Sequence, residues 1–375
     1  MKILMILSNP FMVDPRVYKE AKSLVDDGHE VTVIVWDRKR EYEPENTVEG
    51  IKIVRIHNTG LMEMLPNDLF RNQFWWRKAC KKGLELYKND FKFDLVHCHD
   101  LDTLQSGVWL KKKLGIKLIY DAHEIFGYMI SRNLPKIFVN YAFKMEKRLI
   151  KNIDYLVTAE ETYNDYFKSL GCKSIVTILN CKDIIEEKYQ HPTNEIFTIV
   201  YIGILNQSRF FPENLEVIGN IEDVKFIIAG KKENMYDDIE KLSKKYDNIE
   251  FLGAIPFHKV IPYTFKANVV LCMINPDDIN NRIASANKQF EAMVCGRAII
   301  CTKGVRSGEI TAKEKCGLVV NYSKDSLREA IVKLRDSPEL CEKFGRNALN
   351  AAIDKYNWRT ERKKLLNLYK KIEMI

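Results

Sequence analysis

The stretch SANKQFEAMVCGRAIIC, residues 285–301, contains a short amphipathic helix pattern that runs through a glycine directly into an apolar strand. The first half of the chain shows the same alternation, as in KILMILS (2–8), PRVYKEAKSLVDDG (15–28) and HEVTVIVW (29–36). Apolar strands separated by helices indicate parallel sheets that are covered on both faces. The alternation restarts with FTIVYIG (197–203) after a polar stretch. We therefore predict an α/β chain of two doubly wound domains, residues 1–190 and 191–356.

The overall composition is that of an ordinary globular protein. A chain of 375 residues exceeds what one hydrophobic core usually serves, which agrees with two domains. The apolar run at the N-terminus is short and stops at Asn9-Pro10, and no stretch reaches the roughly 18 apolar residues of a membrane span. Nine scattered cysteines without a C-x-x-C pair indicate reduced thiols. We expect a cytoplasmic protein.

The positive charge is concentrated in one part of the chain. The net charge is +8, and residues 71–150 contain 16 Lys and Arg against 8 Asp and Glu. Within this part, DLFRNQFWWRKACKKGLELYK (68–88) mixes aromatic and basic residues. Such a helix can lie on an anionic membrane surface, so we predict peripheral association at the inner face of the membrane. The alternative is a solvated helix with the tryptophan pair packed inward. No recognised nucleic-acid module accompanies the charge, so we expect no nucleic-acid partner.

Two segments of the second half combine a strand end with groups that attract anions. A strand ends at Gly203, and Arg209 lies in the loop that follows it. Ser285 or Asn287 can cap the helix of the opening stretch, whose positive N-terminal end is a ready anion site. Parallel sheets bind ligands at the carboxyl ends of their strands. Both segments are therefore candidates for one phosphate site.

Lys288 and Glu291 lie one turn apart on that helix. A carboxylate close to a phosphate is favourable only where it accepts hydrogen bonds from hydroxyls, such as those of a ribose. The alternative for the two residues is an ion pair on the helix surface.

The segment NKQFEAMVCGRAIICTKGVRSGEI, with CGLVVNYSKDSLREAI after it, resembles the nucleotide-sugar signature of glycosyltransferase family 4. The resemblance continues through LVHCHDLDT, LIYDAHEIF and ILNCKD to the closing YNWRTERKKLLNLYKKI. It implies the GT-B fold, in which two Rossmann-like domains face each other across a cleft and the C-terminal helix, here 357–375, packs back on the first domain. It also implies a retaining enzyme that uses a nucleoside-diphosphate sugar.

The resemblance assigns roles to three residues and shows two departures. Glu291 matches the glutamate that holds the donor ribose, Arg209 the basic residue on the diphosphate, and His123 the histidine beside the transferred sugar. The first glutamate of the family's E-x7-E motif is replaced by Ile283, and one of its paired phosphate ligands by Ile204. Candidate substitutes for the lost groups are Arg282, Asn287 and Lys288.

The first half contributes the expected acceptor side. Asp14 and Pro15 suit the N-cap and first position of a helix, which places Arg16 beside that helix N-terminus for an acceptor phosphate or the donor. HCHDLDT (97–103) follows a strand and offers His99 and Asp100 to the acceptor. Its DLD imitates a D-x-D metal motif, but a second nucleotide domain makes such a metal unnecessary. We expect no metal and no cofactor.

The favoured function is metal-independent transfer of a sugar from a nucleoside-diphosphate sugar to a glycan or a lipid-linked acceptor. Arg209, Lys288 and the helix N-terminus near Ser285 would stabilise the departing diphosphate. Two alternatives stay open: a GT-B protein that binds nucleotide or glycan without transfer, and a sugar-nucleotide epimerase of the same architecture.

Overall fold

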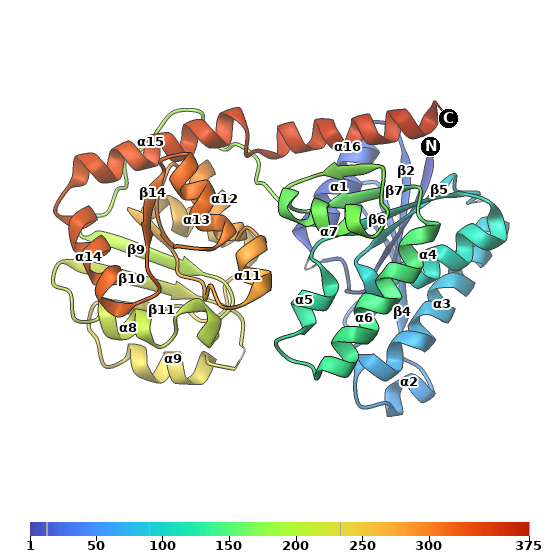
Figure 1. Cartoon of the computed structure of the whole chain (residues 1–375), viewed down its shortest axis with the longest axis horizontal. Helices are drawn as coiled ribbons and strands as arrows, with labels where there is room; N and C mark the ends of the chain where they lie inside the picture. The colour runs from blue at the N-terminus through green and yellow to red at the C-terminus, as the bar shows by residue number, and fades with distance from the viewer. Residues whose placement is uncertain (13, 90, 233, 375) are drawn as a thin grey trace. The chain divides into compact units, whose positions relative to one another are not determined.

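The computed structural model describes residues 1–12, 14–89, 91–232 and 234–374. The chain forms two compact units (Figure 1). Unit 1 comprises Met1–Leu179 together with the C-terminal segment from Arg362, and unit 2 comprises Asn180–Glu361. The chain thus leaves unit 1 near residue 180 and returns to it near residue 362. The boundary predicted from the sequence was residue 190.

Unit 1 is built, in the part described, on an eight-stranded sheet of order β3-β4-β2-β1-β5-β6-β7-β8. All its pairings are parallel except that of β3 with β4 at one edge. The strands are β1 (Lys2–Leu7), β2 (Glu30–Asp37), β3 (Glu45–Val48), β4 (Ile51–His57), β5 (Leu95–His99), β6 (Lys117–Ala122), β7 (Tyr155–Thr158) and β8 (Ile175–Thr177).

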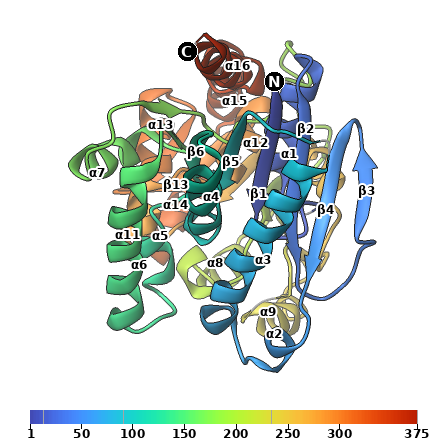
Figure 2. The same cartoon turned by 90° about the vertical axis from the view of Figure 1, so that its right-hand side faces the viewer.

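The helices of unit 1 lie between these strands along the chain. They are α1 (Pro15–Asp26), α2 (Leu61–Met64), α3 (Asp68–Lys88), α4 (Leu101–Leu114), α5 (Phe126–Ile130), α6 (Lys136–Leu149) and α7 (Asn164–Ser169), with two short turns of 3-10 helix at Ile150–Asn152 and Glu161–Tyr163. Helices α3 and α4 lie side by side over the sheet (Figure 2). The last helix, α16 (Trp358–Glu373), crosses the unit boundary and buries Leu365 and Tyr369. As expected, Asp14 caps α1: it accepts hydrogen bonds from the backbone N–H groups of Arg16 and Val17, and Pro15 is the first helical residue.

Unit 2 has a six-stranded parallel sheet of order β11-β10-β9-β12-β13-β14 in the part described. Its strands are β9 (Phe197–Ile202), β10 (Val224–Ala229), β11 (Ile249–Phe251), β12 (Val269–Cys272), β13 (Ala298–Thr302) and β14 (Gly317–Val320). Its helices are α8 (Glu213–Ile218), α9 (Tyr236–Ser243), α10 (Val260–Lys266), α11 (Ile279–Ile283), α12 (Asn287–Val294), α13 (Arg306–Lys313), α14 (Lys324–Arg335) and α15 (Pro338–Asp354), with 3-10 turns at Gln207–Arg209 and Phe257–Lys259.

The two sheets share one topological feature that positions the candidate residues. In unit 1 the strand order reverses between β1 and β5, and in unit 2 it reverses between β9 and β12. Right-handed crossovers then put helices on opposite faces on either side of the reversal and leave a crevice at the carboxyl ends of these strands. The predicted fold of two doubly wound parallel-sheet domains is confirmed.

The basic helix of residues 68–88 differs from the membrane prediction in one respect. Trp75 is fully buried and stacks on Trp36 of β2 with ring centroids 5.2 Å apart, and Trp76 donates its indole N–H to the carbonyl of Asp102. The tryptophan pair therefore packs inward, because each ring finds an apolar or hydrogen-bonding partner in the core. Phe70, at the start of α3, is exposed. Across the described residues, the search for a helix of membrane-spanning length and hydropathy gives none.

Candidate functional site

The crevice of unit 2 brings Gly203, Arg209 and Lys288 together. Arg209 follows β9 in a 3-10 turn and donates a hydrogen bond of 2.9 Å from Nη1 to Oδ1 of Asn281 on α11. Lys288 belongs to α12, on the other side of the strand reversal, and extends its amine toward the end of β9. Its Nζ would lie 3.1 Å from a Cβ at position 203. The glycine that ends this strand therefore leaves the space in which the Lys288 amine lies.

The Lys288 amine is buried without a hydrogen-bond acceptor. The residue is only 8% exposed, and its Nζ lies 3.3 Å from the centroid of the Tyr201 ring. Among the described residues, Nζ has no hydrogen-bond partner, and neither Lys288 nor Arg209 forms an ion pair with a carboxylate. Burial of an unpaired cation costs free energy. An anionic ligand at this position would remove that cost.

The surroundings lower the proton affinity of this amine. Burial lowers the pKa of Lys288 to about 7, the thiol of Cys272 acts in the opposite direction, and the charge of Arg209 lowers it further. Arg209 and Lys288 therefore lie close enough for their charges to interact. Near pH 7 the lysine can therefore take up a proton when a negative charge arrives.

Glu291 forms an ion pair that the sequence did not reveal. Its Oε1 lies 3.1 Å from Nζ of Lys182, and both residues are buried. The alternative of a Lys288–Glu291 ion pair is wrong, because Lys288 points to Tyr201 instead. Lys182 also lies over the ring of Phe257, and its carbonyl accepts the N–H of Trp358. Nothing in the local pattern of Lys182 signals this partner, which is more than a hundred residues away.

The start of α12 corrects the predicted cap. The N-cap residue is Ala286, and no side chain caps the helix. Ser285 precedes the cap, while the Asn287 side chain accepts a hydrogen bond from Asn180. Ala286 instead donates its N–H to the hydroxyl of Ser307, which fixes the approach of the chain to the helix. The first amides of α12 thus have no side-chain acceptor, as an anion site requires.

The two departures from the family motif lie around the same crevice. Ile204 is exposed, and Ile283 is half-buried at the end of α11. Arg282 is exposed, whereas Lys288 is buried with its amine beside Gly203. Of the three candidate substitutes, Lys288 is therefore the one whose charge lies next to position 204.

In unit 1 the predicted residues converge on Asp121, at the end of β6. Arg16 holds this carboxylate with two hydrogen bonds, from Nε at 3.2 Å and from Nη2 at 2.9 Å. His99 Nδ1 and His123 Nε2 each lie 3.2 Å from Asp121 Oδ2. Burial favours the neutral acid, but Arg16 and His123 keep the pKa of Asp121 well below its usual range. Asp121 is thus a buried anion, and sequence reasoning did not single it out.

Arg16 has a different role from the predicted one. Besides Asp121, its guanidinium donates to the carbonyl of Ile178 at 2.7 Å and lies 3.2 Å from Glu20. The residue is 3% exposed. A guanidinium that is buried and engaged in this way is an internal counter-ion, so the structure corrects its assignment as a ligand of an acceptor phosphate.

His123 is held as a cation between two carboxylates. Its Nδ1 lies 3.3 Å from Asp100 Oδ2, and the Asp100 side chain also accepts the backbone N–H of His123. Burial lowers the pKa of His123, but Asp100 and Asp121 outweigh this effect and raise it to about 10. Burial raises the pKa of Asp100 to about 7 against the opposite effect of His123. His123 is therefore a protonated imidazole whose charge is balanced by Asp100 and Asp121 at the carboxyl ends of β5 and β6.

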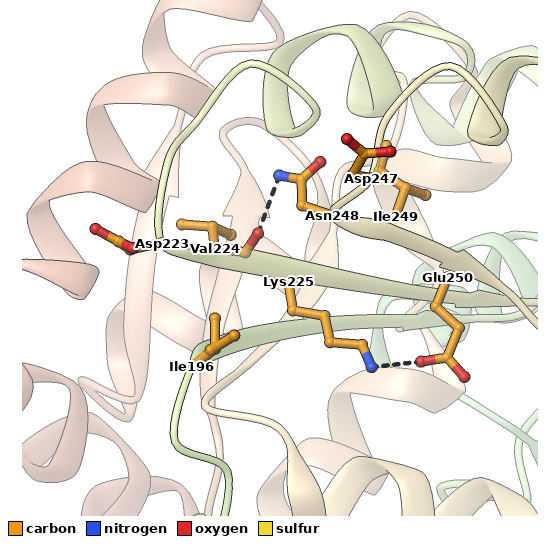
Figure 3. A pocket seen from close by; sticks show the side chains of 8 residues that line it. All are labelled: Ile196, Asp223, Val224, Lys225, Asp247, Asn248, Ile249 and Glu250. Atoms are coloured by element: carbon orange, nitrogen blue, oxygen red, sulfur yellow. Dashed lines mark hydrogen bonds and ion pairs between the residues drawn. The ribbon is translucent and has the colours of Figure 1, made fainter.

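The hollow in Figure 3 lies away from these residues. It is lined at the amino ends of β9, β10 and β11 by residues that include Ile196, Lys225 and Asn248. Lys225 pairs with Glu250 at 2.6 Å, so its charge is already compensated. This hollow therefore lacks the unpaired cations of the crevice at the opposite end of the sheet.

Comparison with known proteins agrees with this architecture. The model of glycosyltransferase family 4 matches residues 15–184, and that of glycosyl transferases group 1 matches residues 196–337. An uncharacterized glycosyltransferase from Methanocaldococcus jannaschii is 24% identical over 349 residues, which cover 85% of this chain and 84% of that protein.

Solved structures show the same fold at low identity. Sucrose-phosphate synthase from Thermosynechococcus elongatus superposes with a TM-score of 0.82 at 15% identity, covering both chains completely. Anabaena HepE in complex with UDP-glucose superposes with a TM-score of 0.74 at 14% identity, over 99% of this chain and 100% of that one. These likenesses show the GT-B fold. The two family models follow each other along most of the chain, and they show that it belongs to the family 4 and group 1 glycosyltransferases.

Proposed function

We propose that the protein is a retaining glycosyltransferase that transfers a sugar from a nucleoside-diphosphate sugar without a metal ion on the diphosphate. The observation that carries the proposal is the unpaired Lys288 amine beside Arg209 at the strand reversal of unit 2. A diphosphate gains one negative charge as the bond to the sugar breaks. Two fixed cations and the uncapped start of α12 would stabilise that charge as a metal does in other enzymes.

In this scheme unit 2 binds the donor. The diphosphate lies at Lys288 and Arg209, and Glu291, oriented by Lys182, accepts hydrogen bonds from the ribose hydroxyls. The bond from the anomeric carbon to the diphosphate oxygen breaks as the bond to the acceptor oxygen forms on the same face. The acceptor proton passes to the departing diphosphate, which has gained the charge.

Unit 1 supplies the acceptor side, and His123 positions the transferring sugar. His99 is fully buried behind His123, so we assign it to positioning His123. Asp100, whose side chain is about one-third exposed, is the group that an acceptor hydroxyl can reach.

UDP is the first donor nucleotide to test, because HepE was crystallised with UDP and UDP-glucose. Thermal unfolding with a panel of nucleoside-diphosphate sugars, in excess chelator, measures preferential binding to the folded chain. The selected donor is then incubated with acceptors, and transfer and slow hydrolysis are followed in chelator. Loss of turnover in chelator, restored by Mg²⁺, would contradict the metal-free scheme.

The same assay separates the two alternatives. A binding protein without activity would show donor stabilisation but neither transfer nor hydrolysis, and an epimerase would convert the donor sugar without releasing nucleotide. The position of Lys288 favours the enzyme, since it supplies a cation next to the one lost at Ile204.

We further propose that the acceptor is membrane-borne, and we extend the membrane surface from α3 to α6. Ile137, Phe138 and Tyr141 are exposed on α6, with Lys136 and Lys144 beside them. An amphipathic surface that combines exposed apolar groups with lysines suits an anionic bilayer. In vesicle sedimentation, I137S/F138S/Y141S should lower binding to anionic vesicles, whereas K231E/K232E in unit 2 should not. Unchanged binding in the triple variant and in K78E/K81E/K82E would exclude both helices.

A further inference from the structure

Tyr201, near the end of β9, contacts two parts of the candidate diphosphate site. Its side chain is fully buried, the centroid of its ring lies 3.3 Å from Nζ of Lys288, and its hydroxyl donates to the carbonyl of Ile204. A Cβ at position 203 would lie 3.1 Å from this Nζ and 3.7 Å from the hydroxyl oxygen of Tyr201. The amine, the phenol and the end of the strand therefore meet at one point.

The position of the ring is that of a cation–π contact. The face of an aromatic ring carries partial negative charge, and it attracts an ammonium group within about 6 Å of its centroid. Lys288 Nζ is well inside this distance. The amine is buried and has no hydrogen-bond partner among the described residues, so the ring face replaces part of the hydration that it has lost.

The other groups around the amine influence its charge without fixing its position. Cys272 and Cys301 act on it from β12 and β13, Arg209 from the turn after β9, and Glu291 from α12 itself. The thiols and the carboxylate favour the protonated amine, whereas Arg209 disfavours it. Within the described residues none of them is hydrogen-bonded to Nζ. Tyr201 differs from them because its ring both packs against the amine and favours its charged form.

The ring is itself held in place on two sides. Phe211 packs edge-on against it, with centroids 4.9 Å apart and planes at 84°, and both residues belong to the hydrophobic core of unit 2. At the other end, the hydroxyl is anchored on the carbonyl of Ile204. A lysine side chain is flexible, so an amine with a fixed position needs a rigid support. The ring of Tyr201 provides one.

We propose that Tyr201 is a positioning residue for the donor diphosphate, because its ring keeps the protonated Lys288 amine at the end of β9, next to position 204. The inference rests on the proposed function. It goes further by explaining how a lysine from α12 supplies a cation beside Ile204, where the basic residue is missing. In this scheme Tyr201 acts through Lys288 and is not itself a ligand of the donor.

The charge distribution of the ring can be changed with little change in its shape. A ring-trifluorinated phenylalanine, incorporated at position 201 by amber suppression, resembles the side chain of Y201F but has much less negative charge on its faces. In the ligand-free protein, the Lys288 amine can be titrated by NMR of carbon-13-labelled lysine, with its signal assigned by its absence in K288M. We expect a midpoint about one pH unit lower in the trifluorinated protein than in Y201F. F211L, which alters the ring packed against Tyr201, is the control for a general change of the core and should titrate like the wild type.

The affinity for UDP-glucose connects this support to the donor. By calorimetry, the trifluorinated protein should bind about tenfold more weakly than Y201F near pH 8 but only about twofold more weakly near pH 6, where the amine is largely protonated in Y201F. A ring with only a structural role would lower the affinity equally at both pH values. Y201F should show the same difference between the two pH values as the wild type, because it retains the ring.

Two results would overturn the proposal. Equal midpoints in Y201F and the trifluorinated protein would show that the ring does not act on the amine. A lower midpoint with an equal loss of affinity at both pH values would show that the supported amine does not serve the donor. A wild type that binds neither UDP-glucose nor any other sugar nucleotide of the panel would instead contradict the proposed function, and the midpoint would still decide whether the ring supports the amine.

Discussion

The strand reversals of the two units are built from similar elements, but the cations near them differ in whether they are paired with carboxylates. In unit 1, Arg16 and His123 are enclosed by their own carboxylates, and Asp121 contacts both of them. In unit 2, Lys288 and Arg209 lie near each other with no carboxylate paired to either among the described residues. The charges of Arg16 and His123 are neutralised by carboxylates of the protein itself. Lys288 and Arg209 have no such carboxylates among the described residues, so an anionic ligand can neutralise them. Substitutions in unit 1 should therefore mainly lower stability or turnover, whereas substitutions in unit 2 should mainly weaken nucleotide binding.

The largest effect is expected on stability, from unit 1. D121N removes the anion that Arg16 and His123 share, and breaking such a buried pair costs about 3–5 kcal/mol. Urea unfolding of D121N should show this loss. D165N, at an exposed aspartate of α7, is the control and should unfold like the wild type. A stable D121N would mean that the cluster does not hold unit 1 together.

The next effect is on turnover. H123A removes the side chain that positions the transferring sugar in our scheme, and we expect kcat to fall roughly a hundredfold, as when one preorganised polar group is lost from an active site. The Kd for UDP, measured by calorimetry, should change little because the proposed nucleotide site lies in unit 2. A large rise in Kd would contradict the prediction that His123 affects turnover but not nucleotide binding.

Substitution of Lys288 should weaken UDP binding without lowering stability. K288M should weaken UDP binding by roughly 10- to 100-fold, the value of one hydrogen bond to a charged group. The ligand-free variant should be at least as stable as the wild type, because it no longer buries an unpaired amine. K266M, on α10, is the control. A destabilised K288M with normal affinity would show that the amine has a structural role only.

The pH dependence of stability and of UDP-glucose affinity tests the same role of Lys288. The pKa of Lys288 is lowered from 10.5 to about 7 in the ligand-free protein. Between these values the unfolded chain binds more protons, so stability without ligand should rise with pH across this range, and K288M should lack this contribution. Affinity for UDP-glucose, whose diphosphate does not titrate there, should fall up to tenfold per pH unit above 7, since binding requires a protonated amine. A flat affinity profile from pH 7 to 9 would contradict this role.

Glu291 should give the smallest change. E291Q weakens acceptance of the ribose hydroxyls, and we expect a loss of about 1 kcal/mol, or roughly fivefold, in UDP affinity. It also leaves Lys182 buried without its anion, so stability should fall too. K182M/E291Q separates the two effects: it should recover stability but not affinity. Recovery of both would make Glu291 a partner of Lys182 only.

The features that the sequence predicted share one property: each depends on neighbours along the chain. Apolar runs identified the strands, Asp14-Pro15 identified the start of α1, and the strand ends located Arg209 and His99 at the two reversals. Such patterns involve only a few neighbouring residues, so they can be recognised without knowledge of the tertiary contacts.

The features that were missed depend on contacts between distant residues. Trp75 packs inward, which was the alternative for its helix, and the partner that decides this, Trp36, lies in another element. Arg16 is an internal counter-ion because Asp121 and Glu20 lie beside it. Glu291 meets Lys182 rather than Lys288, although only Lys288 is its helix neighbour. Local spacing carries no information on these pairs, since topology brings them together.

The return of the chain to unit 1 has a consequence for its synthesis. Unit 2 is one continuous segment, whereas unit 1 needs α16, whose Tyr369 contacts His97 of β5. On the ribosome, the first 179 residues emerge early but lack that helix until Trp358–Glu373 has been made. Unit 2 can thus fold before unit 1 is complete, and removal of residues 362–375 would leave the earliest-made strands of unit 1 without their final cover.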